Sequence, residues 1–271
     1  MSTASIDGRA DGGIRRRVEH VMGMPISLAL RGRHTSSLAA ERAWDAAINR
    51  LHEMDLIFST YRDDSIINRL DRGELMIEEC PPEVAEVLAL GEQAEQSSGG
   101  AFSINLPTAD GRRRLDPSGV VKGWAVQQAA QFLSPLDDTD FCLSAGGDMV
   151  CHVASDERPA WRIGIEHPHD PRTLIAVVPI RSGAVATSGT THRGAHLIDP
   201  RTGRPPSGVA SVTVIEASLT WADIDATAAY VQGADAERWL RSRPVRGALI
   251  VWADGATTTL PADFTTNNKP N

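Results

Sequence analysis

Residues 209–233, with the sequence VASVTVIEASLTWADIDATAAYVQG, join a pattern typical of a strand to a pattern typical of a helix. The run from Val209 to Ile215 is short, apolar and rich in β-branched residues, so it favours a strand. The segment from Trp221 to Gln232 favours a helix, and Gly233 is its stop signal. The stretch therefore predicts a strand that is followed closely by a helix.

Outward from this stretch, strand patterns and helix patterns fall in separate groups. Further helices are expected after Ser37 as far as Phe58, from Glu83 to Gln96, and from Ser118 to Leu133, with apolar residues at three- and four-residue intervals. Further strands are expected at Pro25 to Arg31, Phe141 to Ala145, Met149 to Val153, Trp161 to Ile165, Leu174 to Ile180, Ala248 to Trp252 and Thr257 to Leu260. This grouping predicts an α+β protein whose helices pack on a sheet.

The composition narrows the class of protein. At 271 residues and 41% apolar content, the chain can bury one large core or two closely joined ones. The formal net charge of −8 argues against binding a phosphate backbone, so no nucleic acid partner is expected. No segment reads as a secretory signal or a membrane span, which predicts a cytoplasmic protein. Cys80, Cys142 and Cys151 lack metal-site spacing and are interpreted as reduced thiols.

Asp223 and Thr227 are the first candidate for chemistry. Residues four apart lie on one face of a helix, so this carboxylate and this hydroxyl can reach one cation. Mg²⁺ often takes only one or two protein ligands while phosphate and water supply the rest, which suits so sparse a pair. Asp225 is expected to point away from them around the helix. By spacing alone, a first-turn charge followed by a routine helix residue is the favoured explanation of the pattern.

The segment from Asp116 to Lys122 is the second candidate. It places a carboxylate, a glycine and a lysine at the start of an expected helix. The free N–H groups of a helix N-terminus favour phosphate, and Gly119 lets a ligand approach the backbone closely. The alternative is an ordinary capping turn that begins with Pro117 and carries a surface lysine.

Two further segments are expected to be turns. The sequence from His196 to Gly203 reads as a short strand that ends in an Asp-Pro-x-Thr-Gly turn. Ser144 to Asp148 contains paired glycines, which form a tight bend or allow close contact between backbone and ligand. A purely structural turn is enough to explain the residues of either segment.

Together, the order and spacing of these segments resemble the FAD:protein FMN transferase family, also called ApbE, over roughly Met22 to Gly233. The resemblance lies in Met22-Gly23, Ser59-Thr60-Tyr61 with Ser65, Gly100-Ala101-Phe102, Asp116 to Gly123, Ala145 to Asp148, Ser188-Gly189, His196 to Gly203 and Ala222 to Thr227. It implies an α+β fold with a T-fold-like portion and helices on a mainly antiparallel sheet. The expected organisation is a disordered head over residues 1–17, a catalytic region over 18–262 formed by one domain or two intimately packed subdomains, and a frayed tail over 263–271.

The resemblance also implies a set of site residues. Magnesium ligands are expected at the backbone carbonyl of Gly119 and at the side chains of Asp223 and Thr227, with catalytic roles for Asp223, Lys122 and His196. Contacts with FAD are expected at Met22, Ser59, Thr60, Tyr61, Ala101, Phe102, Ser103, Asp116, Lys122, His196 and Ile198. Three features depart from the usual family pattern: Ser103, Thr190 and the short segment from Thr191 to Ala195.

The implied reaction moves FMN from FAD onto a Thr or Ser hydroxyl of a target protein and releases AMP. The implied target carries an Asp…Gly-Ala-Thr/Ser acceptor sequence. Two other readings remain open from the residues: a magnesium-dependent FAD pyrophosphatase that uses water as acceptor, and an FAD-binding protein without activity. The segment from Asp254 to Thr257 resembles a shortened acceptor sequence, but its Asp-Gly pair is typical of a hairpin turn.

Overall fold

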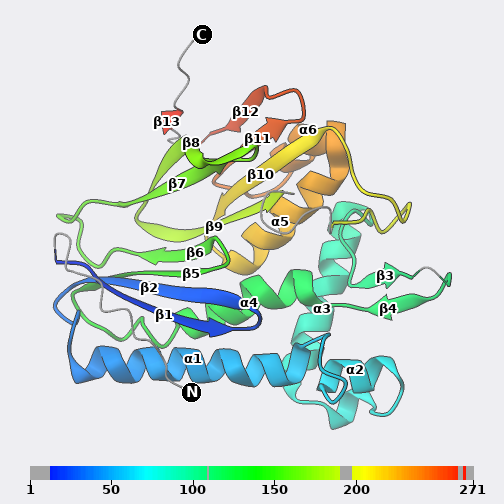
Figure 1. Cartoon of the computed structure of the whole chain (residues 1–271), viewed down its shortest axis with the longest axis horizontal. Coiled ribbons are helices and arrows are strands. Elements are labelled where there is room, and N and C mark those ends of the chain that lie inside the picture. Colours follow the sequence, from blue (N-terminus) through cyan, green and yellow to red (C-terminus); the bar gives the residue numbers. More distant parts are fainter. Residues whose placement is uncertain (1–12, 109, 190–196, 262–264, 267–271) are drawn as a thin grey trace.

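The fold is built around an eight-stranded sheet (Figure 1). The structure is a computed structural model that describes residues 13–108, 110–189, 197–261 and 265–266. In spatial order the strands of the sheet are β1 (Arg15–Val21), β2 (Met24–Gly32), β5 (Thr139–Ala145), β6 (Asp148–His152), β9 (Ser182–Gly189), β10 (Val209–Glu216), β11 (Gly247–Trp252) and β12 (Thr257–Leu260). Every strand pairing in the described part of the chain is antiparallel.

Helices cover one face of this sheet. The helices α1 (Leu38–Phe58), α4 (Ser118–Ala130), α5 (Leu219–Gln232) and α6 (Ala236–Arg241) pack on its strands, whereas α2 (Ile66–Asp71) packs against α1 and α3 (Pro82–Ser98) packs against α4. Single 3₁₀ turns lie at Ile77–Glu79 and Gly233–Asp235. The expected cap of α1 is confirmed, because the Ser37 side chain accepts from the Ala40 N–H at 3.2 Å. Trp44, Leu51 and Phe58 lie on the buried stripe of α1, so its apolar spacing predicted the packed face.

The other face of the sheet is covered by a second, three-stranded sheet of β7 (Trp161–His167), β8 (Asp170–Ile180) and β13 (Thr265–Thr266). Ile163 of β7 and Val178 of β8 pack in one apolar cluster with Val185 of β9 and Leu249 of β11. A separate pair of short strands, β3 (Asn105–Pro107) and β4 (Arg113–Leu115), projects beside α3 in Figure 1. The central strands β10 and β11 are therefore buried on both faces of the large sheet.

The α+β class, with helices on a mainly antiparallel sheet, is confirmed, but several boundaries were wrong. Residues 15–17 belong to β1 rather than to a disordered head, and residues 265–266 form β13 rather than a frayed tail. No strand was predicted at Ser182–Gly189, which is β9 in the middle of the large sheet. The remaining residues of the expected head and tail lie largely outside the described ranges.

The hairpin expected at Asp254-Gly255 is confirmed between β11 and β12. The Trp252 N–H donates to the Ala256 carbonyl at 2.8 Å, and Gly255 has a φ of 87°, which a glycine adopts without strain. Asp254 accepts the Ala256 N–H at 2.9 Å. The turn geometry alone therefore explains why these residue types occur there.

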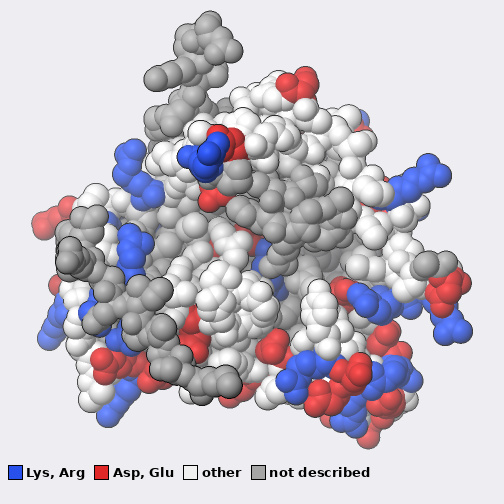
Figure 2. All heavy atoms as spheres, viewed as in Figure 1, with Lys and Arg blue, Asp and Glu red and all other residues white. Residues whose placement is uncertain are grey.

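Charged side chains of both signs are interspersed on the face shown in Figure 2, mainly towards its periphery, while the centre is mostly uncharged. No continuous basic patch is visible among the described residues of that face, in keeping with the net charge of −8. Among the described residues, no helix combines the length and apolar character that a bilayer crossing requires.

Candidate active site

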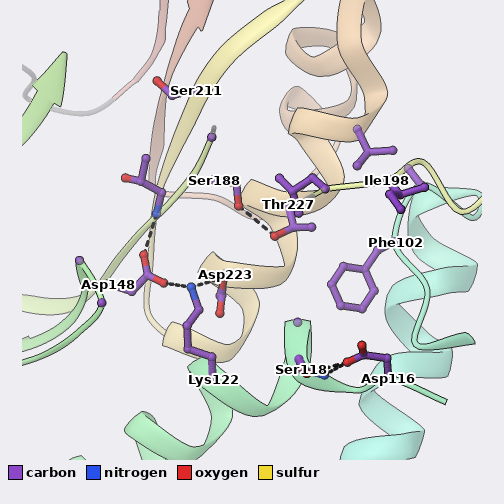
Figure 3. Close-up of a pocket in the computed structure, with 18 of the residues that line it drawn as sticks. Phe102, Asp116, Ser118, Lys122, Asp148, Ser188, Ile198, Ser211, Asp223 and Thr227 are labelled. Carbon is purple, nitrogen blue, oxygen red and sulfur yellow. Dashed lines mark hydrogen bonds and ion pairs between the residues drawn. The ribbon is translucent and has the colours of Figure 1, made fainter. Parts of the chain in front are cut away.

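A cavity of about 510 Å³ lies where α4 and α5 meet the ends of β6 and β9, and β7 contributes to its wall (Figure 3). Most of the predicted site residues line it: Thr60, Tyr61, Ala101, Phe102, Ser103, Asp116, Gly119, Lys122, Ile198, Asp223 and Thr227. Met22 and Ser59 are not among its lining residues. His196, Thr190 and residues 191–195 lie outside the described part of the chain.

Lys122 is the cation at the centre of the site. Its side chain extends from α4 and forms ion pairs with Asp148 at the start of β6 and with Asp223 of α5, where Nζ lies 3.1 Å from Oδ1 (Figure 3). Burial opposes the charge of the ammonium, but the two carboxylates outweigh burial and raise the pKa of Lys122. The amine is therefore protonated throughout the neutral range.

Gly123 allows this contact between α4 and α5. A Cβ atom built at Gly123 would lie 2.8 Å from the carbonyl oxygen of Leu219 and 3.1 Å from the Cβ of Asp223. A glycine is therefore required for the two helices to approach this closely. Their close approach brings Lys122, next to Gly123 in the sequence, within reach of Asp223.

Asp148 ends a candidate segment predicted from the sequence, but its own role in the site was not predicted. Its second oxygen, Oδ1, accepts the Thr187 N–H of β9 at 2.9 Å, so both oxygens of the carboxylate have partners. Gly146 and Gly147 precede it with φ angles of 56° and 102°, which allow the chain to turn tightly into β6. The paired glycines predicted the bend, but the contact between Asp148 and Lys122 depends on tertiary packing.

Asp223 and Thr227 lie on the same face of α5, as their four-residue spacing predicted. The Thr227 hydroxyl lies 2.9 Å from the hydroxyl of Ser188, at the end of β9. Asp225 faces the opposite side of the helix, where both of its oxygens accept from Arg243 Nε at 3.2 and 3.0 Å. Its expected orientation away from the site is therefore confirmed.

The N-terminus of α4 forms the opposite wall of the cavity. Asp116 Oδ1 accepts the N–H and the hydroxyl of Ser118 at 3.2 and 2.6 Å, which forms an Asx turn just before the helix. A Cβ at Gly119 would lie 3.0 Å from two ring carbons of Phe102, so the glycine lets this ring rest against the helix. The turn was predicted correctly, and the Asp116 side chain stabilises it.

The rim of the cavity carries two exposed apolar side chains. Tyr61 is 98% exposed and Ile198 is 41% exposed, although both line the opening. Large apolar side chains that are so exposed beside a cavity are typical of a ligand-binding site. By contrast, Ser103 is buried and its hydroxyl donates to Glu95 Oε2 at 2.8 Å.

The predicted Asp-Pro-x-Thr-Gly turn lies beside the cavity, which Pro200 of the turn lines. The Gly203 N–H donates to the Asp199 carbonyl at 2.8 Å, which confirms the turn. The Asp199 carboxylate accepts both the backbone N–H and the Nε of Arg201 at 2.9 Å. Burial would raise the pKa of Asp199, but Arg201 holds it below its ordinary value. Asp199 therefore remains charged and keeps the turn beside the cavity.

Comparisons with known proteins match most of this chain. A family model described as the ApbE family matches residues 22–110 and 105–250. An FAD:protein FMN transferase of Vibrio cholerae is 34% identical over 129 residues, which are 44% of this chain and 39% of the relative. An FAD:protein FMN transferase of Rhodobacter capsulatus is 34% identical over 160 residues, 55% of this chain and 30% of the relative. The matched segments thus span well under half the length of these relatives.

Solved structures match over nearly the whole chain. The apo flavinyl transferase ApbE of Pseudomonas stutzeri has a TM-score of 0.77 at 22% identity, covering 91% of this chain and 94% of that one. The ApbE protein of Thermotoga maritima has a TM-score of 0.68 at 23% identity, covering 90% and 96%. At this level of identity the likeness establishes a shared fold.

Proposed function

This chain belongs to the ApbE family, and from that premise we propose that it is an FAD:protein FMN transferase, the activity named for its relatives in V. cholerae and R. capsulatus. In the proposed reaction, a Thr or Ser hydroxyl of a target protein attacks the phosphorus of FAD that belongs to its FMN half. A phosphoester with FMN forms, the bond between the two phosphates breaks, and AMP leaves.

The observation that carries the proposal is the meeting of Lys122, Asp223 and Thr227 at one wall of the cavity. Cleavage of a pyrophosphate builds negative charge on the phosphate oxygens and on the leaving phosphate. A buried site with a fixed cation and hard oxygen ligands can stabilise that charge with little reorganisation. A protein that only stored flavin would not need such a site.

The donors fit a magnesium ion. The Asp223 carboxylate, the Thr227 hydroxyl and the backbone carbonyl of Gly119 are hard oxygen ligands from residues that line the same cavity. When bound, Mg²⁺ would neutralise charge on the phosphate oxygens of FAD. The Ser188 hydroxyl, 2.9 Å from Thr227, holds the Thr227 side chain in its orientation.

Lys122 and Asp148 have distinct proposed roles. The Lys122 ammonium binds phosphate oxygens and stabilises the leaving AMP phosphate as the bond breaks. Asp148 does not touch the substrate in this proposal; it orients Lys122 while its other oxygen is fixed by the Thr187 N–H. The N-terminal turn of α4, which contains Gly119, faces the same cavity and favours a bound anion.

The rings of FAD would be held by the apolar rim. Tyr61 and Phe102 offer aromatic faces, and Ile198 offers an aliphatic surface at the opening. Thr60, Ala101, Ser103 and Asp116 complete the proposed contacts within the cavity. Met22 and Ser59 stay predictions that rest on the resemblance alone.

The proton of the attacking hydroxyl needs an acceptor. His196 has the chemistry for this role near neutral pH, as do a phosphate-bound water and an acidic side chain. The base is left unassigned among these three. The Asp…Gly-Ala-Thr/Ser acceptor sequence and the cytoplasmic location likewise stay predictions from the sequence.

Incubation with FAD, Mg²⁺ and a domain that carries this acceptor sequence tests the proposal, with flavin fluorescence of the denatured acceptor read in a gel. The wild-type protein and a Glu237→Gln control, which removes only a surface ion pair with Arg241, should label the acceptor. Asp223→Asn should label it weakly or not at all. Absence of a fluorescent acceptor with folded wild-type protein and bound FAD would overturn the proposal.

A further inference from the structure

Cys142 and Cys151 face each other across β5 and β6, within the large sheet. They are direct partners in the strand register, and their Sγ atoms lie 3.6 Å apart. Both side chains lie in the apolar cluster between the large sheet and β7–β8. The proposed transferase activity uses neither thiol.

The strand register favours a disulfide at this position. The hairpin closes at the pair Ala145–Asp148 around Gly146 and Gly147, both with positive φ, as in a two-residue hairpin turn. Hydrogen-bonded and non-hydrogen-bonded pairs alternate along antiparallel strands, and a two-residue turn is flanked by a hydrogen-bonded pair. Counting back three pairs makes Cys142–Cys151 a non-hydrogen-bonded pair, whose Cα atoms are about 4.5 Å apart, within the range that a disulfide spans.

The two thiols differ in exposure and acidity. Cys151 is 2% exposed, whereas Cys142 is partly exposed, so a small reagent reaches Cys142 more easily. The Cys151 thiol donates to Cys142 Sγ, and this hydrogen bond lowers the pKa of Cys142; burial opposes the lowering, and the positive charge of Arg16 assists it. The same contact, together with burial, raises the pKa of Cys151. Cys142 is therefore the nucleophile of the pair.

We propose that Cys142 and Cys151 are a reversible oxidation site, which a small peroxide converts into an intrachain disulfide. The Cys142 thiolate attacks one peroxide oxygen, the O–O bond breaks, and a sulfenic acid forms while the departing oxygen takes up a proton. Cys151 sulfur then attacks the sulfenic sulfur, the S–S bond forms and the S–O bond breaks. The hydroxyl leaves as water with the proton of the Cys151 thiol, so two thiols and one hydrogen peroxide give one disulfide and two waters.

The bond would link the two strands of the hairpin whose turn leads into Asp148. Met149 connects the thiol pair to the site, because its sulfur lies 3.9 Å from Cys142 Sγ and its side chain lines the cavity. A disulfide between directly opposed strand residues is strained, since its Cβ atoms must draw together, and strained disulfides are readily reduced. The link is therefore reversible by small thiols.

Peptide mapping of the reduced, full-length protein tests the inference. The folded protein is treated with dilute hydrogen peroxide, then denatured and alkylated with N-ethylmaleimide before mass spectrometry. We expect Cys142 and Cys151 to be linked, with a loss of two hydrogen atoms, while Cys80 is alkylated in full, and dithiothreitol should restore all three thiols. A sulfinic acid at Cys142 beside an alkylated Cys151, a link to Cys80, or three unreacted thiols would each overturn the inference.

Two matched variants sharpen the test. Cys80→Ser should form the same link as fast as the wild type, because Cys80 takes no part. Cys151→Ser keeps the size of the side chain but removes the second thiol, so the sulfenic acid at Cys142 should persist and be trapped by dimedone. If dimedone labelled the wild type as strongly as a folded Cys151→Ser protein, the pairing would be refuted. If that variant does not fold, the peptide map of the oxidised wild type tests the pairing by itself.

Discussion

Replacing Glu216 with Gln should remove a large part of the pH dependence of stability. Glu216 ends β10, is 6% exposed and lies beside the fully buried Asp225 of α5. Burial, followed by the negative charge of Asp225, raises the pKa of Glu216 to about 8, even though Arg243 and Arg246 act in the opposite direction. Glu216 is therefore mostly neutral in the folded protein at pH 7.

The direction of this pH dependence follows from the raised pKa of Glu216. In the unfolded chain this carboxyl has a pKa of 4.5, so above that pH the folded state holds more protons than the unfolded state. Its stabilising contribution is complete below pH 4.5 and is lost as the pH rises through about 8. For these two pKa values, linkage predicts a loss of roughly 2.5 kcal/mol in the free energy of unfolding between about pH 6 and 9.

Urea unfolding at pH 6 and at pH 9 measures this loss. The wild type should lose roughly 2–3 kcal/mol more than Glu216→Gln over that interval, since Gln cannot ionise. Glu237→Gln, at an exposed ion pair, should keep the wild-type dependence on pH. If Glu216→Gln and the wild type lost equal stability between the two pH values, the assignment of a neutral Glu216 would be refuted.

Three further changes probe the site itself. Asp223→Asn should lower the magnesium-dependent release of AMP from FAD by about 100-fold or more, because the charge stabilisation lost is several kcal/mol; a rate within a few-fold of the wild type would contradict its role. Tyr61→Ala should raise KM for FAD roughly tenfold, because the side chain would contact the flavin. It should leave the unfolding midpoint unchanged, because the residue is 98% exposed; an unchanged KM would exclude the ring from binding. Gly123→Ala places a Cβ 2.8 Å from the Leu219 carbonyl, so urea unfolding should show a loss of about 1–3 kcal/mol together with reduced activity; full activity would mean that α4 and α5 need not approach so closely.

The parts of the fold that were predictable carry their signal within a few residues. The apolar stripe of α1 recurs at helical intervals, and its Ser37 cap lies just before it. β9 was missed because its sequence, SGAVATSG, is short of large β-branched residues. Small residues are needed there, since a Cβ at Gly183 would lie 2.5 Å from the Glu216 carbonyl and one at Gly189 would lie 3.0 Å from the Ala210 carbonyl. That requirement exists only in the assembled sheet.

The residues of the candidate site likewise comprise some that local sequence predicts and others that depend on tertiary packing. The four-residue spacing of Asp223 and Thr227 places them on one helical face, which the sequence reveals directly. Asp148 is separated from Lys122 by 26 positions, and their contact depends on how β6 packs against α4. Likewise, β1 begins with three exposed or half-exposed arginines, so its pairing with β2 is not visible in its composition. Long-range packing decided these features.

The central claim is that the cavity transfers FMN from FAD to a protein hydroxyl, and one mass spectrum tests it most directly. The acceptor domain is incubated with this protein, FAD and Mg²⁺, and its intact mass is measured beside the amount of AMP released. If the cavity transfers FMN, the acceptor mass should increase by FMN less one water, at the Thr or Ser of the acceptor sequence, with one AMP released for each FMN attached. An unchanged acceptor mass, with AMP released equally well when the acceptor is left out, would contradict the transfer and indicate hydrolysis by water instead.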